Sequence, residues 1–378
     1  MNNNLFEPTI VEQKPTDSLP TNVAKIAVIG VGGGGCNMIN HMISEGISKI
    51  DLIVANTDLQ SLRASEAPIK IQLGAELTKG LGAGMKPDVG RESAKESYED
   101  LKTALLGSDI VFIASGLGGG TGTGAAAVVA KAAREVNALT VSVVTKPFKW
   151  EGKKRAALAN IGLEDLKKVS DSIIIIKNDK LSDIIDKNTQ YDNAFKIVDN
   201  ILYQAVNGMA EVILKPGSRG INVDFSDVRT VMQHRGMALM GIGKGKGEIA
   251  VQDAFENAVK SPLLDEIALS SAKGIILHWT IHPKISLLSI TDIMDHINDS
   301  IDSNADIIFG TTTDETLGED EVKLTIVASG FEINQEDGVE SSQNPTITKI
   351  NDNPSSPNYY DTPPQMRGYS IKYSLAEI

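Results

Sequence analysis

The sequence predicts an α/β fold in which a doubly wound parallel sheet is followed by a long central helix and a smaller α/β second domain. Three observations predict it. Apolar strand-like runs alternate with helical runs in the first half, one apolar 3.6-residue period then persists for over twenty residues, and a second alternation follows. Because 378 residues exceed what one compact core normally holds, two domains are expected.

The first domain, expected over residues 23–191, alternates strands with helices. The predicted strands are the apolar runs 23–30, 50–56, 109–115, 139–145 and 172–177. The predicted helices, which carry apolar residues on one face, are 36–45, 91–106, 125–137 and 151–169. Residues 57–90 lack a period and are expected to be mostly loop. Strands that are joined through helices lie parallel with right-handed crossovers, which makes the sheet doubly wound.

The central helix is expected over residues 192–217, where Pro216 and Gly217 end it. At 1.5 Å per residue such a helix is about 30–35 Å long. Its apolar residues cover more than one stripe, so we expect it to be buried on two sides as a connecting spine.

The second domain, expected over residues 218–330, alternates again. The predicted helices are 226–233, 249–260 and 291–301, and the predicted strands are 237–241, 272–281, 306–310 and 322–328. The alternating glycines from Gly241 to Gly247 are interpreted as a mobile turn.

Both ends of the chain are polar. Residues 1–22 are expected to form a disordered arm, and residues 331–378 a disordered linker and tail peptide, with structure possible in residues 359–378.

Composition narrows the function classes. The 36 Lys and Arg against 49 Asp and Glu give a formal net charge of −13, which argues against a protein that grips nucleic-acid backbone. The single cysteine, Cys36, leaves no internal disulfide and is interpreted as a packing residue. No apolar run approaches the roughly 18 residues that a membrane helix needs. We expect a cytoplasmic protein with no nucleic-acid partner, which can still hold a phosphorylated small molecule through backbone amides.

Glycine is concentrated in three segments. Fourteen of the 34 glycines lie in residues 30–35, 80–84 and 116–124. The first segment follows a predicted strand and has the GxGxxG spacing of dinucleotide-binding loops. The third has the same setting and adds two threonine hydroxyls. A dinucleotide needs one such loop for its pyrophosphate, whereas a triphosphate with a metal can occupy two.

No GxxxxGK[ST] sequence is present, so the chain is not a Walker-type P-loop protein. An NAD(P)-dependent oxidoreductase built on the first glycine loop remains the alternative. His278 and His282 lack a nearby acidic pattern and are not assigned as metal ligands.

Several separated motifs resemble the tubulin/FtsZ family of GTPases. The run GGGTGTG at 118–124 is similar to the family signature, and the chain from 23 to about 330 looks like the bacterial cell-division members. The resemblance implies GTP or GDP with Mg²⁺, hydrolysis activated by polymerisation, and head-to-tail filaments that form the cytokinetic ring at midcell. The nucleotide contacts that it implies are Gly32, Gly33, Gly34, Gly35, Asn37, Asn56, Ala83, Gly84, Gly118, Gly119, Gly120, Thr121, Gly122, Thr123, Gly124, Glu151, Arg155, Asn178, Phe195 and Asp199.

Three of these residues, Asn178, Phe195 and Asp199, resemble the family's guanine contacts. A carboxylate such as Asp199 can accept hydrogen bonds from N1–H and the 2-amino group of guanine, which adenine cannot offer there. Phe195, one helical turn earlier, could stack on the base, and Asn178 offers a donor and an acceptor. From the residues alone, a core phenylalanine and a helix-surface aspartate remain the alternatives.

Asn222, Asp224 and Asp227 resemble the family's catalytic loop. Carboxylates at a helix start are also typical of capping, but such a pair could orient an attacking water. About 30 Å of helix separates these acids from the guanine contacts, so they cannot reach the nucleotide of their own molecule. They could reach a neighbour's in a head-to-tail filament, which does not close on itself.

The C-terminal tail departs from the family pattern. Residues 360–367 keep the Asp, one Pro and the Arg of the family's partner-binding peptide but lack its Ile and its Phe-Leu pair. The resemblance therefore implies membrane-tethering or division-regulating partners that bind this tail through a diverged motif.

Overall fold

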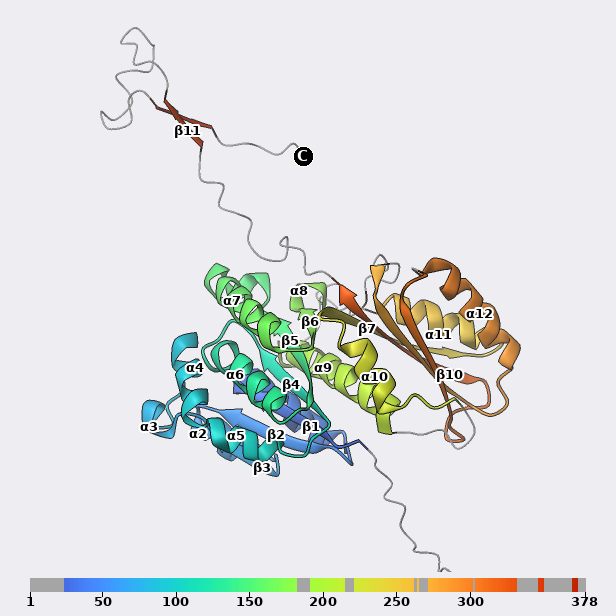
Figure 1. Cartoon of the computed structure of the whole chain (residues 1–378), viewed down its shortest axis with the longest axis horizontal. Coiled ribbons are helices and arrows are strands. Elements are labelled where there is room, and N and C mark those ends of the chain that lie inside the picture. The colour runs from blue at the N-terminus through green and yellow to red at the C-terminus, as the bar shows by residue number, and fades with distance from the viewer. Residues whose placement is uncertain are drawn as a thin grey trace, which may run out of the picture. The chain divides into compact units, whose positions relative to one another are not determined.

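The computed structural model describes residues 24–181, 191–214, 221–261, 264, 271–301, 303–331, 346–349 and 369–372. The chain up to Glu332 forms one compact unit, and the segment from Ile333 onward forms a second. The first unit is an α/β structure with helices on both faces of its sheet (Figure 1). The predicted fold class is therefore confirmed.

The parallel half of the sheet follows the predicted strand pattern. Its strands are β1 (Ile26–Val31), β2 (Asp51–Asn56), β3 (Ile69–Gln72), β4 (Ile110–Gly116), β5 (Leu139–Lys146) and β6 (Ser172–Lys177). Along β1, Ile26 and Val28 join the core on one face while Ala27 and Ile29 join the core on the other. Strands with two buried faces read as continuous apolar runs, which is why they could be recognised.

Helices cover both faces. They are α1 (Gly32–Ser44), α2 (Leu59–Ala64), α3 (Ala75–Thr78), α4 (Pro87–Glu96), α5 (Tyr98–Leu105), α6 (Thr121–Glu135), α7 (Lys153–Val169) and α8 (Asn178–Leu181). Helices α1 and α6 begin four residues earlier than predicted, inside the glycine segments. Glycine has low helix propensity, so its runs were assigned to loops, but here it permits close packing against neighbouring backbone.

The prediction of loop over residues 57–90 was wrong, because α2, β3, α3 and the start of α4 lie there. The short elements have four to six residues, too few to show a period, and depend on long-range contacts. The single helix predicted over 91–106 is two helices. They meet at Ser97, whose hydroxyl donates to the Gln72 carbonyl (3.0 Å) and accepts from Gly74 N (3.3 Å).

The central helix is α9 (Tyr191–Leu214). Its Leu202 and Val206 belong to the same hydrophobic core as Met38 of α1 and Met240 of the second domain. In Figure 1 the helix lies between the half that carries α1–α8 and the half that carries the later helices. It is buried against both, as the apolar pattern predicted.

The second domain continues the sheet. Its elements are α10 (Phe225–Met232), β7 (Gly236–Lys246), α11 (Ala250–Val259), β8 (Gly274–Ile281), α12 (Leu287–Ser300), β9 (Asp306–Thr313) and β10 (Glu321–Phe331). Strand β7 pairs parallel with β6 from Ser172↔Gly236 to Ile174↔Ala238, and β10 pairs antiparallel with β7 and β8. The strand order is β3-β2-β1-β4-β5-β6-β7-β10-β8-β9, so one sheet runs through both domains.

The interpretation of Gly241–Gly247 as a mobile turn was wrong, because β7 extends through Lys246. A Cβ added at Gly241, Gly243 or Gly245 would lie 2.2, 1.9 or 1.9 Å from a backbone carbonyl oxygen of α11. The strand period of two puts these glycines on one face, where they let α11 lie directly on the strand.

Two short strands lie in the second unit. They are β11 (Thr346–Lys349) and β12 (Tyr369–Lys372), which pair antiparallel. The predicted arm at 1–22 and the tail motif at 360–367 lie outside the described residues. No helix of the described chain is long and apolar enough to cross a membrane.

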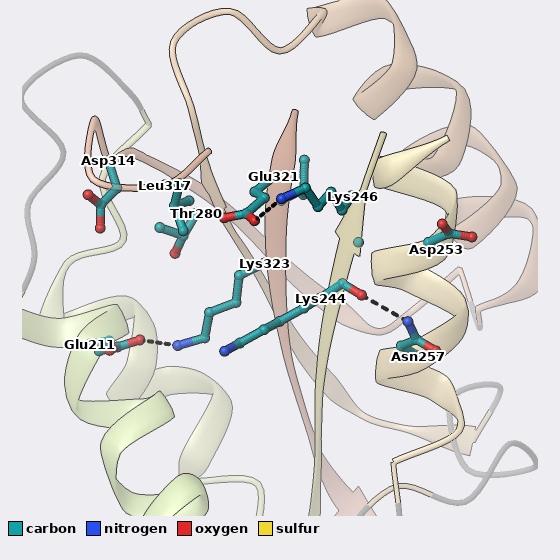
Figure 2. A pocket seen from close by; sticks show the side chains of 12 residues that line it. Glu211, Lys244, Lys246, Asp253, Asn257, Thr280, Asp314, Leu317, Glu321 and Lys323 are labelled. Carbon is teal, nitrogen blue, oxygen red and sulfur yellow. Dashed lines mark hydrogen bonds and ion pairs between the residues drawn. The ribbon is translucent and has the colours of Figure 1, made fainter. Parts of the chain in front are cut away.

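A cleft of about 590 Å³ lies between α9 and the sheet of the second domain (Figure 2). Across it, Lys323 of β10 pairs with Glu211 of α9 at 2.5 Å, and these side chains are only 18% and 20% exposed. Asn207 donates to the same carboxylate at 3.2 Å. The pair therefore ties the central helix to the second domain.

We expect Gly243→Ala to lower the free energy of unfolding by about 3 kcal/mol, because α11 must move away from β7. Urea denaturation measures this loss. Lys244→Ala, on the exposed face of the same strand, should change stability by less than about 0.5 kcal/mol. Equal effects would contradict the close strand-helix contact.

We expect Lys323→Met to cost about 2 kcal/mol, because the mostly buried Glu211 carboxylate loses its cation. The double variant Lys323→Met/Glu211→Gln should recover part of that loss in the same denaturation experiment. Lys246 and Glu321 form a matched exposed pair in the same cleft at 2.9 Å, and Lys246→Met should cost under about 0.5 kcal/mol.

Candidate functional site

The glycine segments 30–35 and 116–124 emerge side by side. Strands β1 and β4 are paired in parallel, with Gly30 opposite Ala114 and Val31 opposite Ser115. Because the carboxyl ends of parallel strands meet at one edge, the segments that follow them, and the N-termini of α1 and α6, lie together there.

The two segments touch through their backbones. A Cβ added at Gly32 would lie 2.8 Å from Gly122 N, and one at Gly34 would lie 3.3 Å from Gly116 Cα. Gly32 also has a φ of +72°, which side-chain-bearing residues rarely adopt. The contact therefore requires glycine at Gly32 for two independent reasons.

The third glycine segment, residues 80–84, closes against the other two. A Cβ at Gly120 would lie 2.8 Å from Ala83 Cβ. Gly82 N donates to the Thr57 carbonyl at 3.2 Å, and the hydroxyls of Thr57 and Thr121 are 2.7 Å apart. The structure thus brings together all three segments that the sequence singled out.

Each segment presents one glycine to open space. A Cβ added at Gly33, Gly84 or Gly119 would have no other atom within 4 Å. These three glycines leave room for a ligand to approach the backbone, which is the geometry that a phosphate chain needs at helix N-termini.

Other predicted residues of the loops serve the loop itself. The Thr123 hydroxyl accepts from Gly118 N at 2.9 Å, and Thr123 is buried. A Cβ at Gly124 would lie 1.9 Å from the Pro87 carbonyl oxygen, and one at Gly35 would lie 2.5 Å from the Ala114 carbonyl oxygen. These residues therefore contact the backbone of the loops and of the neighbouring elements, and they hold the loops in position.

Cys36 and Asn56 support the first loop. Burial raises the pKa of the Cys36 thiol to about 11, so it stays protonated and is a packing residue. Asn56 is also buried, and its amide lies 3.7 Å from Cys36 Sγ and 3.3 Å from Asp58 N. Its side chain therefore holds the turn after β2 against α1.

Glu151 and Arg155 flank the second loop. Glu151 ends a short 3₁₀ helix (Lys149–Glu151) and accepts from Phe148 N at 3.0 Å. Arg155 pairs with Glu151 at 2.6 Å, and a Cβ at Gly118 would lie 3.0 Å from the Arg155 carbonyl oxygen. The predicted motif is thus packed onto the glycine loop.

Polar groups on α8 and α9 fit a base-binding end. Asn178 is buried, and its Oδ1 has no hydrogen-bond partner among the described residues. Burial raises the pKa of Asp199 to about 6, and the nearby positive charge of His41 opposes that rise. An unpaired buried polar atom costs free energy, so a ligand that pairs with Asn178 Oδ1 would remove that cost. The side chain of Phe195 lies outside the described residues.

The predicted catalytic acids form a capping box. Asp224 Oδ1 accepts from Asp227 N at 2.9 Å, and Asp227 Oδ2 accepts from Asp224 N at 3.2 Å. Both residues start α10, beyond the far end of α9, whose 24 residues span about 36 Å. The structure does not bring Asn222, Asp224 or Asp227 together with the glycine segments.

Comparisons with known proteins match this arrangement. The GTPase-domain model of the tubulin/FtsZ family matches residues 25–186, and the C-terminal-domain model of the FtsZ family matches residues 236–332. An FtsZ dimer from M. jannaschii is 44% identical, with a TM-score of 0.74 over 81% of this chain and 88% of that chain. The chain belongs to the tubulin/FtsZ family.

CetZ2 from Haloferax volcanii, a GTPγS-bound protofilament, and CetZ1, a GDP-bound monomer, share the fold of this family member. They are 18% and 19% identical, each with a TM-score of 0.69 over 82% of this chain, and cover 94% and 95% of their own chains. Membership in a GTPase family favours GTP over the dinucleotide of the oxidoreductase alternative. The bacterial origin that the motifs implied stays a prediction.

His278, which the sequence did not assign as a metal ligand, is buried in the second domain. Its ring nitrogen lies 2.9 Å from the Thr312 hydroxyl. Among the described residues no group of three His, Cys, Asp or Glu side chains could hold a metal ion.

We expect Gly119→Ala to fold normally but to lower GTP affinity at least tenfold, because the added methyl group enters the open side of the cradle. Thermal unfolding and titration with a fluorescent GTP analogue measure the two effects. Gly124→Ala is the matched control, since its methyl group meets the Pro87 carbonyl instead and should destabilise the fold by about 3 kcal/mol. A Gly119→Ala protein that binds GTP normally would contradict this cradle.

Proposed function

We propose that this chain binds GTP in the cradle of Gly33, Gly84 and Gly119 and hydrolyses it within head-to-tail filaments. The observation that carries the proposal is the open approach to one glycine in each of three segments, at the N-termini of two helices, in a member of a GTPase family. Backbone amides and helix dipoles can hold phosphate without a basic surface, which is compatible with the −13 charge.

The base would lie between α1 and α9. The Asp199 carboxylate accepts from N1–H and the 2-amino group of guanine, and the unpaired Oδ1 of Asn178 can accept from a donor of the base. Phe195, one turn before Asp199, stacks on the ring. Glu151 and Arg155 bind on the ribose and phosphate side, and Asn37 and Asn56 line the first loop. A Mg²⁺ ion bound with the nucleotide would neutralise charge on the phosphates.

The acids would act on the nucleotide of the next subunit. The capping box uses one oxygen of each carboxylate, and the other oxygen of each makes no hydrogen bond within the described chain. Those oxygens, on the exposed Asp224 and the half-buried Asp227 at a helix start, can orient an attacking water, with Asn222 beside them. The length of α9 prevents the same acids from reaching their own nucleotide.

Stacking the acidic end of one subunit on the glycine edge of the next completes each site. Such a heterologous contact repeats without closing and yields a filament. Two of the related structures are an FtsZ dimer and a CetZ2 protofilament, and they support self-association of this chain. Hydrolysis would then depend on polymerisation.

In the cell, we place these filaments in the cytokinetic ring of a bacterium, in the cytoplasm at midcell. Membrane-tethering and division-regulating proteins would bind the diverged tail. The motif resemblance to cell-division members of the family supports this role, and the FtsZ C-terminal-domain match agrees with it.

The catalytic role is tested by Asp224→Asn, because asparagine caps a helix as well as aspartate does but carries no charge. We expect phosphate release to fall at least a hundredfold while GTP affinity, sedimentation and thermal stability stay unchanged. Ser226→Ala, in the same turn, is the control and should keep its activity. Near wild-type turnover in Asp224→Asn would exclude the assigned role.

Mixing two impaired variants, at a GTP concentration that saturates the Asp224→Asn cradle but not the Gly119→Ala cradle, tests whether the acids act between subunits. Asp224→Asn keeps the nucleotide cradle, and Gly119→Ala keeps the acids. In a mixture, junctions that join the cradle of the first to the acids of the second should hydrolyse GTP, so activity should return. A mixture that stays inactive, although the two variants co-sediment, would argue for acids that act within one molecule.

A further inference from the structure

The acid loop, residues 221–224, is tied to the edge strand of the second domain. Strand β9 is the last strand in the sheet order, so its outer edge offers backbone groups to other segments. Thr311 N donates to the Ile221 carbonyl oxygen at 2.8 Å, and Ile221 N donates to the Thr311 hydroxyl at 2.9 Å. Thr311 therefore binds both backbone polar groups of Ile221.

The second of these hydrogen bonds depends on the side chain of Thr311. Residues that face each other in a hydrogen-bonded antiparallel pair exchange both bonds through their backbones. Here the Thr311 hydroxyl accepts in place of a backbone carbonyl, so the Ile221 amide is held in this way only if the residue at this position carries an acceptor. Thr311 is buried and β-branched, which restricts its χ1 and keeps the hydroxyl aimed at the loop.

Val223 is a second point of attachment, two residues farther along the acid loop. Its side chain is buried, and a Cβ added at Gly310 of β9 would lie 2.3 Å from Val223 Cγ2. The same Cβ would lie 3.3 Å from the Ile221 carbonyl oxygen. Gly310 therefore leaves the space in which the acid loop lies against β9.

These two attachments determine which residues the acid loop presents to solvent. Val223 is buried, whereas Asn222 and Asp224 on either side of it are exposed, which is the alternation of an extended chain. Asp224 itself has an extended backbone (φ −85°, ψ 167°) and begins the capping box with Asp227. The position of the proposed catalytic residues therefore depends on where β9 holds the loop.

We propose that Thr311 is a positioning residue for GTP hydrolysis, which acts through Ile221 to hold the acid loop in the orientation that the nucleotide of the next subunit requires. This inference rests on the proposed catalytic role of Asp224. Phosphoryl transfer depends mainly on positioning, so a loop that is free to move at Ile221 should orient the attacking water poorly although both acids are present. The sequence does not reveal this role, since Thr311 is the first of three consecutive threonines and lies 90 residues from Ile221.

The Thr311 hydroxyl should matter more for the acid loop than for the fold. Ile221 is 56% exposed, so water can take the place of the hydroxyl at its amide. An amide that exchanges a protein acceptor for water loses little free energy. Removal of the hydroxyl should therefore loosen the loop without unfolding the domain, which separates a positioning role from a structural one.

The experiment measures phosphate release by the full chain at saturating GTP, per amount of sedimented filament. Thr311→Val keeps the β-branched shape and the backbone N–H but has no side-chain acceptor. We expect its kcat to fall about tenfold, while the KM for GTP, sedimentation and thermal stability stay at wild-type values. Thr311→Ser keeps the acceptor and should retain most of the kcat. Thr313→Val is the matched control, the same substitution two residues farther along β9, and should change none of these quantities.

A structural role would give a different result. Wild-type kcat in Thr311→Val would overturn the proposal. So would a loss of kcat that Thr311→Ser shares, or one that accompanies an equal loss of thermal stability or of sedimentation. Should Thr311→Val fail to fold, Thr311→Ala, which also lacks the acceptor, is judged by the same criteria.

The double variant Thr311→Val/Asp224→Asn separates this inference from the proposed function. If Thr311 acts through the acid loop, adding Thr311→Val to Asp224→Asn should lower phosphate release much less than it does in the wild-type chain. A further fall of about tenfold in the double variant would remove the positioning role alone. Near wild-type turnover in Asp224→Asn itself would remove the catalytic role on which the inference rests, whatever Thr311 does.

Discussion

The backbone contact between the two main glycine loops is the constraint on which the candidate site depends. It exists because β1 and β4 are neighbouring parallel strands, so the loops that follow them leave the sheet at the same edge. The contact then extends outward. A Cβ at Gly90 would lie 2.5 Å from the Gly120 carbonyl, and one at Gly124 would lie 1.9 Å from the Pro87 carbonyl, so α4 is drawn against α6 as well. The glycines keep side chains out of the contact between the segments. Their first role is therefore to allow close backbone packing, and any role in binding depends on that packing.

Much of the fold could be predicted because buried parallel strands and a two-sided helix leave long apolar patterns. The strand at residues 172–177 and the helix α9 were found in this way. The elements that were not predicted have no such pattern. Strand β3, for example, is four residues long and is held by its pairing with β2. The second half of β7 was predicted as a turn because its glycines are typical of turns. Only the structure shows that these glycines lie against the carbonyl oxygens of α11.

That the three glycine segments form one candidate site could be predicted from the sequence, but their geometry could not. The sequence identified the glycines of all three segments, yet Gly33 faces open space while Gly35, two positions later, faces the Ala114 carbonyl. The spacing of the glycines cannot separate these two roles, because the role of each glycine depends on how closely β4 approaches it. Asp224 and Asp227 were likewise open to two interpretations, and the capping box that they form is compatible with both, since it uses only one oxygen of each.

The placement of the two proposed half-sites limits how this chain can be regulated. One hydrophobic core includes Met38 of α1, Val206 of α9 and Met240 of β7, and the pair of Lys323 and Glu211 adds a polar tie across the same junction. Because α9 holds the two domains apart along about 36 Å, no hinge closure within one molecule could bring the acids of α10 to the glycine edge. In the proposed arrangement, the missing half of each site is supplied by a neighbouring subunit. The length of the central helix would then make hydrolysis depend on assembly, without a moving part inside the subunit.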